Sequence, residues 1–136
     1  MDSNAQPACL PSENTVYSEN LECYISGWGL TEYGTYPNLL KYAQIPIVNQ
    51  GTCKRLYNQG GYNITDSMFC AGNITGGSDT CDGDSGGPLV CEINGKYAVL
   101  GVTSWGHADG CGLPNFPGVY ANVKSLLRWI RKTLAE

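Results

Sequence analysis

The segment Asp79–Cys91, Asp-Thr-Cys-Asp-Gly-Asp-Ser-Gly-Gly-Pro-Leu-Val-Cys, holds the residues of this sequence that are best suited to chemistry. Ser85 stands between small residues, so its hydroxyl has little steric cover, and the glycines beside it let a substrate carbonyl approach the backbone closely. A serine hydroxyl becomes a nucleophile when a general base lies next to it. The pattern therefore indicates nucleophilic catalysis at Ser85.

Other interpretations of this region and of the cysteines do not fit the sequence. Gly83–Gly87 matches Gly-x-Ser-x-Gly, the nucleophile elbow of α/β-hydrolases, but that fold needs a helix after the serine. Here Pro88 and a short β-like run follow, and the chain is too short for the α/β-hydrolase sheet. A calcium loop starting at Asp82 would need Glu at its twelfth position, which is Ile93. No Cys-x-x-Cys pair occurs, so zinc-ribbon and thioredoxin-like sites lack their basic unit.

Several motifs in order resemble the C-terminal half of a serine protease domain of the chymotrypsin/trypsin family, over about residues 5–136. They are Cys23–Gly29, Phe69–Gly72, Gly83–Cys91, Ser104–Gly106 and Pro117–Tyr120, followed by a terminal helix. The resemblance implies an all-β fold, an antiparallel Greek-key β-barrel (the second barrel of the family) with a C-terminal α-helix. It also implies a trypsin-like endopeptidase that works through an acyl-enzyme. A non-catalytic homologue acting as an extracellular binding module, and an unrelated extracellular β module, are the alternatives.

The resemblance implies a role for each residue around the serine. Ser85 is the nucleophile, and the backbone N–H groups of Gly83 and Ser85 form the oxyanion hole. Asp84 pairs with the α-ammonium that appears when a zymogen is cleaved. Asp79 lies at the base of the specificity pocket, where a buried carboxylate selects Lys or Arg at the cleaved position. The other substrate-binding residues that the resemblance implies are Thr80, Ser104, Trp105, Gly106 and Gly118.

The chain departs from the family pattern beside this pocket and lacks its base. Asp82 replaces a longer neutral residue, and the stretch before Cys111 is a little longer than in trypsin. His107 is the only histidine, and we expect an exposed loop histidine there rather than the catalytic base. The family's catalytic His and Asp, and its Ile-Val-Gly-Gly-like start, would lie upstream of residue 1. We therefore expect a fragment that is inactive by itself and needs the N-terminal barrel as its partner.

Cysteine content indicates an oxidising compartment. Seven cysteines among 136 residues, about 5%, are usual for extracellular chains and rare in the cytosol. Spacing alone leaves many pairings open. The resemblance implies Cys23–Cys91, Cys53–Cys70 and Cys81–Cys111, with Cys9 unpaired in this chain and available for a bond to a segment ahead of it. The sequons at Asn63 and Asn73 fit a secretory route, although residues 1–7 do not form a signal peptide.

Composition excludes other classes of protein and of partner. A hydrophobic share of 42% with a charged share of 15% excludes intrinsic disorder. No run approaches the ~20 apolar residues of a membrane helix. The net charge of −4 argues against nucleic acid, because binding to phosphates depends on Lys and Arg. The resemblance implies polypeptide substrates containing Arg or Lys, and we expect no cofactor and no metal.

The elements that position these residues are mostly short strands. We expect a linker or arm over residues 1–22 and the barrel with its terminal helix over residues 23–136. The expected strands are Glu22–Gly29, Leu39–Val48, Pro88–Ile93, Lys96–Trp105 and Gly118–Val123, with a hairpin at Asn94-Gly95. Asn49 predicts the start of a short helix through Tyr57. Asn122 predicts the cap of a terminal helix whose apolar face consists of Val123, Leu126, Leu127, Ile130 and Leu134.

Overall fold

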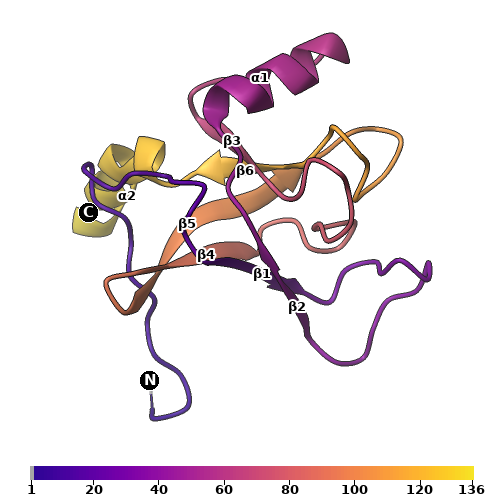
Figure 1. Ribbon diagram of the computed structural model, residues 1–136. Coiled ribbons are helices and arrows are strands. Elements are labelled where there is room, and N and C mark those ends of the chain that lie inside the picture. Colours follow the sequence, from indigo (N-terminus) through magenta and orange to yellow (C-terminus); the bar gives the residue numbers. More distant parts are fainter. Residues whose placement is uncertain (1) are drawn as a thin grey trace.

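The computed structural model describes residues 2–136 (Figure 1). Its strands are β1 (Cys23–Gly27), β2 (Lys41–Ile45), β3 (Met68–Ala71), β4 (Pro88–Ile93), β5 (Lys96–Trp105) and β6 (Gly118–Asn122). Its helices are α1 (Gln50–Gln59) and α2 (Leu127–Ala135), the second preceded by a 3₁₀ turn, Lys124–Leu126. The expected antiparallel all-β fold with a C-terminal helix is confirmed. Three of the expected strands are shorter than expected, and β3 adds a strand that overlaps the Phe69–Gly72 motif.

The six strands form one antiparallel sheet in the order β2-β1-β4-β5-β6-β3. Strand β4 returns to lie beside β1, which is the Greek-key connection. The two ends of the sheet meet just after β2, where Ile47 forms a bridge with Ala71. There the Val48 N–H donates to the Cys70 carbonyl oxygen at 2.9 Å. Hydrogen bonds therefore continue from β2 to β3, and the sheet curls into a barrel.

The inward side chains of the strands form the core, because successive residues of a strand point to opposite faces. Ile25, Leu89, Leu100 and Tyr120 are all at most 4% exposed. Two disulfides lie in the buried part of the barrel, Cys23–Cys91 and Cys53–Cys70, and a third, Cys81–Cys111, joins two loops outside it. They are the same pairs that the resemblance implied. Each contributes roughly 3–4.5 kcal/mol on the loop-entropy estimate.

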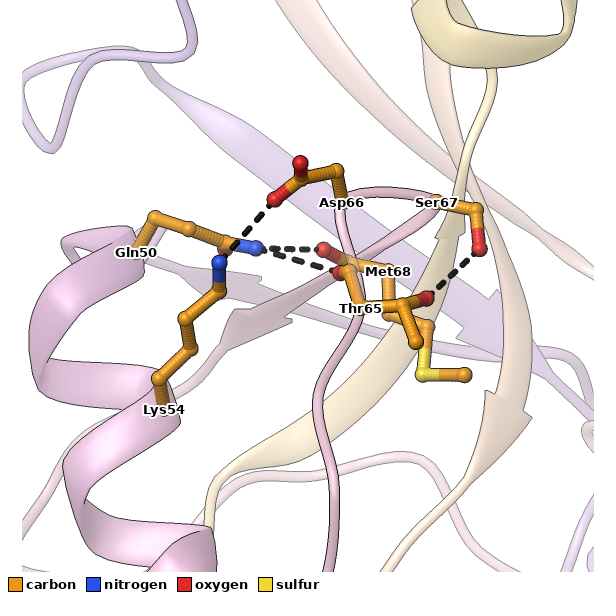
Figure 2. Close-up of polar contacts among 6 residues, drawn as sticks. All are labelled: Gln50, Lys54, Thr65, Asp66, Ser67 and Met68. Carbon is orange, nitrogen blue, oxygen red and sulfur yellow. Dashed lines mark hydrogen bonds and ion pairs between the residues drawn. The ribbon is translucent and has the colours of Figure 1, made fainter.

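Helix α1 begins where its sequence predicted. The Asn49 side chain accepts a hydrogen bond from the Thr52 N–H at 3.2 Å, so one of the free N–H groups of the first turn is satisfied. Figure 2 shows that the Gln50 amide donates to the carbonyl oxygen of Met68 at 2.9 Å. Lys54 pairs with Asp66 at 3.0 Å on the exposed side of the helix. These contacts join α1 to the start of β3.

The C-terminal helix begins later than expected. Asn122 does not cap α2. Its side-chain oxygen lies 3.4 Å from the Ser125 N–H, within the 3₁₀ turn that precedes the helix. Only the first turns of the expected apolar face pack on the barrel, since Val123 and Leu127 are buried while Leu134 is 76% exposed. The helix leaves the barrel surface before its last apolar residue is reached.

The N-terminal arm lies along the barrel without a strand of its own. The Cys9 N–H donates to the Tyr97 carbonyl oxygen at 3.0 Å, and the Val99 N–H donates to the Cys9 carbonyl oxygen at 2.9 Å. Further along, the Tyr17 hydroxyl donates to the Leu100 carbonyl oxygen at 2.8 Å. Partial burial raises the pKa of Tyr17 to about 12. The arm is therefore held to β5 at two points.

Candidate active site

Three loops lie toward the same side of the barrel and carry the residues of interest (Figure 1). They span residues 28–40, 72–87 and 106–117. The Cys81–Cys111 disulfide joins the second loop to the third. A second link between these loops is the hydrogen bond from the Gly77 N–H to the Gly112 carbonyl oxygen, 3.0 Å long. Residues far apart in the sequence are thereby brought to one place.

Two consecutive tight turns present Ser85. The Asp84 N–H donates to the Cys81 carbonyl oxygen at 2.9 Å, and the Gly87 N–H donates to the Asp84 carbonyl oxygen at 3.0 Å. Gly83 and Gly86 occupy the third position of each turn with φ of 94° and 85°, a region that favours glycine. Ser85 itself is exposed. Its hydroxyl stands at the surface because the two turns fold the chain back beneath it.

The backbone around Ser85 offers hydrogen-bond donors. Within residues 2–136, the N–H groups of Gly83 and Ser85 donate to no backbone acceptor. The loop is also anchored on its far side, where the Gly86 N–H donates to the Thr103 carbonyl oxygen at 2.9 Å. The two free N–H groups belong to a segment that β5 holds in place.

Asp84 points away from the surface, toward the Gly27-Trp28-Gly29 segment. Its Oδ1 accepts a hydrogen bond from the Gly29 N–H at 2.8 Å, and its Oδ2 accepts one from the Cys81 N–H at 3.0 Å. A Cβ atom on Gly29 would lie 2.5 Å from the Asp84 Cγ, and one on Gly27 would overlap the same carboxylate. Both glycines are therefore required by the carboxylate. Within residues 2–136, no cationic side chain pairs with Asp84.

Asp79 lies at the junction of the second and third loops. Its Oδ2 accepts a hydrogen bond from the Gly112 N–H at 2.9 Å, whereas its Oδ1 is buried and finds no partner within residues 2–136. Burial raises the pKa of Asp79, and the hydrogen bond from the Gly112 N–H opposes this rise. A Cβ on Gly118 would lie 2.5 Å from this Oδ1. The carboxylate thus presents one unpaired oxygen beside a residue without a side chain.

Thr80, which follows Asp79 directly in the sequence, contacts Tyr120 of β6. The Thr80 hydroxyl lies 3.1 Å from the Tyr120 hydroxyl, and Tyr120 is fully buried. Burial is also the main cause of the raised pKa of Tyr120. Tyr120 was not among the residues expected here, although it belongs to the Pro117–Tyr120 motif.

Strand β5 has a free edge beside the loop of residues 72–87 that carries Ser85. Its pairing with β4 ends at Val102, and a bulge between Thr103 and Trp105 shifts its register with β6. Ser104 is exposed, and a Cβ on Gly106 would meet nothing within 4 Å. The backbone from Ser104 to Gly106 therefore faces open space on one side.

The expectation of an exposed loop histidine is wrong. The His107 side chain is only 15% exposed, and its ring lies 4.2 Å from the Phe116 ring and 5.3 Å from the Tyr62 ring. Its Nδ1 accepts a hydrogen bond from the Asp109 N–H at 3.0 Å. Neither aromatic neighbour adjoins it in the sequence, so only the folded chain creates this packing. The ring is held by these groups rather than by Ser85.

The family model described as Trypsin matches residues 1–130. This chain belongs to the trypsin family. The family is one of serine proteases, which act on polypeptides, and trypsin-family domains with several disulfides are typically extracellular. No helix within residues 2–136 of the trypsin-family chain is long and apolar enough to cross a membrane. The same residues contain no group of three His, Cys, Asp or Glu side chains that could hold a metal ion.

Sequence reasoning missed the partners that hold the two aspartates in this trypsin-family chain. The Gly112 N–H and the Gly29 N–H, donors to Asp79 and Asp84, come from other loops. A backbone N–H carries no signal in the sequence. The glycine pair Gly27 and Gly29 was a usable signal, because glycines flanking a tryptophan suggest that another group packs closely there.

Proposed function

We propose that this chain is the C-terminal part of a trypsin-like serine endopeptidase that cleaves after Arg or Lys. The observation that carries the proposal is the buried Asp79 Oδ1 without a partner. A buried polar atom without a hydrogen bond is costly, so such an atom is expected to have a partner in the working state. The guanidinium of Arg or the ammonium of Lys would supply both the charge and the donor. Gly118 and Gly106 leave room for a long side chain.

The proposed reaction is acyl transfer at Ser85. A histidine from outside these 136 residues takes the hydroxyl proton while Oγ attacks the carbonyl carbon of the substrate. The free N–H groups of Gly83 and Ser85 would stabilise the negative oxygen that forms. Breakage of the carbon–nitrogen bond releases the amine, which takes up the proton, and water then hydrolyses the acyl-enzyme. The free edge from Ser104 to Gly106, including Trp105, would pair with the substrate backbone as an added strand.

Asp84 in this proposal switches the loop between inactive and active shapes. Its carboxylate is held by two N–H groups and by no cation of residues 2–136. An α-ammonium created by cleavage elsewhere in the protein would be its ion-pair partner, and a buried pair of that kind fixes its surroundings. Gly83 neighbours Asp84, so the pair would also fix the oxyanion donors.

We propose further that the protein is secreted and that Cys9 bonds to a segment or chain outside these residues. Cys9 is exposed and is the one free cysteine within residues 2–136. Asn63 and Asn73 are exposed as well, which glycosylation requires. These features support an extracellular protease assembled from more than this chain.

Substrates that differ only at the cleaved position test the proposal. The whole activated protease should hydrolyse Arg and Lys peptides far faster than Phe or Ala peptides. In Asp79→Asn, kcat/KM for the Arg peptide should fall by roughly 30- to 1000-fold, the cost of losing a buried charge partner. Asp66→Asn, which removes an exposed carboxylate elsewhere, is the matched control and should change little. A preference for Phe over Arg would contradict the role of Asp79, and no turnover would favour a binding module.

A further inference from the structure

The charged residues of this chain are divided between two kinds of structure. All eight Lys and Arg residues lie in a helix, in a strand or in the 3₁₀ turn before α2. They are Lys41, Lys54, Arg55, Lys96, Lys124, Arg128, Arg131 and Lys132. Of the twelve Asp and Glu residues, only Glu92 of β4 lies inside one of these elements. The loops therefore carry charge, but within residues 2–136 no Lys or Arg contributes to it.

Intrinsic preferences for helix and strand do not account for this division. Glu has a helix propensity close to that of Lys and Arg, yet neither α1 nor α2 contains an acidic residue. Lys is depleted in strands, yet Lys41 and Lys96 stand at the first positions of β2 and β5. What the eight basic residues share is a place in a hydrogen-bonded element.

A protease would have to break that structure before it could cleave beside these residues. Lys41 is paired with Gly27 of β1, and Lys96 belongs to the paired part of the β4–β5 hairpin. In the 3₁₀ turn, the Lys124 ammonium donates to the Thr15 carbonyl oxygen at 2.8 Å. A substrate that adds a strand to a protease must be extended and unpaired. A bond inside a helix or a paired strand is therefore cleaved only after that element has opened.

The loop of residues 28–40, which projects from β1 and β2, has the opposite character (Figure 1). It contains no Lys or Arg, while its Tyr33 is 82% exposed and its Leu39 is 77% exposed. The other two loops on the side of Ser85, residues 72–87 and 106–117, also contain no Lys or Arg. Exposed loops are the preferred sites of proteolytic cleavage. The most accessible segments thus lack the residues that an Arg- or Lys-specific protease recognises.

We propose that this part of the protease resists cleavage by its own activity, because every bond that follows Lys or Arg lies in a hydrogen-bonded element. The inference rests on the proposed cleavage after Arg or Lys. A protease that selects large apolar side chains finds its bonds in the loop of residues 28–40 instead. Hydrolysis there consumes one water and leaves a carboxylate and an amine. The structure thus blocks self-cleavage and leaves this loop open to a protease of another specificity.

Limited proteolysis of the oxidised chain by added proteases tests the proposal without using the chain's own activity. Added trypsin, which selects Lys and Arg, should cleave the oxidised chain roughly 100-fold more slowly than the reduced and alkylated chain. Added chymotrypsin, whose pocket is apolar, should cleave the oxidised chain rapidly within residues 28–40. Mass spectrometry identifies the bonds that are cut. Trypsin cleavage after Lys41 or Lys96 that is as fast in the oxidised chain as in the reduced chain would overturn the proposal.

Two tyrosines provide matched sites for a new arginine. Tyr33 is 82% exposed in the loop of residues 28–40, and Tyr42 is 77% exposed in β2. Trypsin should cut Tyr33→Arg after position 33 about 30-fold or more faster than it cuts Tyr42→Arg after position 42. Glu32→Arg and Glu92→Arg repeat the comparison between the same loop and β4, because both glutamates are exposed. Equal cleavage rates within both pairs would overturn the proposal, since a place in an element would then give no protection.

Self-incubation of the whole activated protease separates this inference from the proposed function. The bonds that follow the eight basic residues should stay intact while an added Arg peptide is hydrolysed. Self-cleavage at these bonds during that incubation would overturn the inference and leave the proposed function standing. Loss of the preference for Arg would contradict the proposed function, but it would not alter the results with added trypsin.

Discussion

Two aspartates of the same loop have opposite surroundings. Both carboxylate oxygens of Asp84 accept backbone N–H donors, so that group is satisfied without a cation. Asp79 has one oxygen bonded and the other buried without a partner. Asp84 therefore serves to hold the loop, and Asp79 is left able to bind something that is not in the chain.

The charge of Asp79 should cost stability when no ligand is bound. Its pKa is raised above 3.8 mainly by burial, so the folded chain keeps the proton more tightly than the unfolded chain. The free energy of unfolding should therefore fall as pH rises through the raised pKa, and Asp79→Asn should remove that fall and be the more stable chain at neutral pH. Urea unfolding of both chains from acidic to neutral pH measures this. A parent chain that gains stability over that window relative to Asp79→Asn would contradict the prediction.

Benzamidinium binding should show the opposite pH dependence. This aromatic cation resembles an arginine side chain, and only the ionised Asp79 would attract it. The affinity of the oxidised chain should rise as pH increases through the raised pKa of Asp79 and then level off. Titration calorimetry at several pH values measures this, with Asp79→Asn as the control that should bind weakly at every pH. An affinity that does not change with pH would show that the ionised Asp79 does not bind this cation.

Gly29→Ala should destabilise the chain through Asp84. The new Cβ would lie 2.5 Å from the Asp84 Cγ, so the carboxylate or the backbone must move. Overpacking of this kind costs roughly 1–3 kcal/mol. Gly106→Ala is a control for stability because its Cβ would meet nothing within 4 Å. Thermal unfolding compares them, and equal melting temperatures for the two variants would show that the loop adapts freely.

At the scale of elements, the tight turn between β4 and β5 sets the register of these two strands. The β4–β5 hairpin turns at Asn94 and Gly95, whose φ angles of 53° and 79° are both positive. That combination is a type I′ turn, whose twist matches the twist of the strands it joins. The turn thereby aligns β4, which follows Ser85, with β5, which carries Ser104.

Gly95→Ala should weaken this hairpin. An L-residue with a side chain is strained at φ of 79°, and the change should lower the free energy of unfolding by about 1 kcal/mol. Lys96→Ala, at the next and exposed position, should have little effect. Chemical denaturation gives both values. A stability loss in Lys96→Ala as large as that in Gly95→Ala would indicate that side-chain contacts, rather than the turn, matter there.

At the scale of the whole molecule, no histidine within residues 2–136 forms a hydrogen bond with Ser85. His107, the only histidine, is packed against Phe116 and Tyr62. Loss of a triad histidine or serine costs on the order of 10⁶ in rate in comparable enzymes. Residues 1–136, refolded with their disulfides, should therefore show essentially no turnover of an Arg substrate. Rapid stoichiometric labelling of Ser85 by a serine-reactive phosphonate would contradict this account.

The free thiol should be countable in the same preparation. Cys9 is exposed while the other six cysteines form disulfides. The native oxidised chain should thus react with one equivalent of a maleimide, and Cys9→Ser should react with none. Mass spectrometry gives the count, and peptide mapping locates the label. Two or more labels on the native parent chain would mean that one of the bridges does not form.

Local chemistry by itself determined a large part of this protein. The Asn49 cap and the Asn94-Gly95 hairpin follow from short-range rules, because each depends on residues within a few positions. The order of the motifs around Ser85 indicated the family and with it the barrel. The sequence could not show where α2 stops packing on the barrel. Leu134 is as apolar as Leu127, but only Leu127 is buried against the barrel.

Tertiary structure alone decided the surroundings of the functional groups. Asp79 receives its hydrogen bond from Gly112 and keeps one oxygen unpaired because two loops meet at a disulfide. His107 is covered because Tyr62 and Phe116 converge on it. The Tyr24 ring meets the rings of Tyr42 and Tyr97 because β2, β1, β4 and β5 follow one another in the sheet. In each case the decisive contact joins residues far apart in the chain, and such contacts exist only after the sheet has curled.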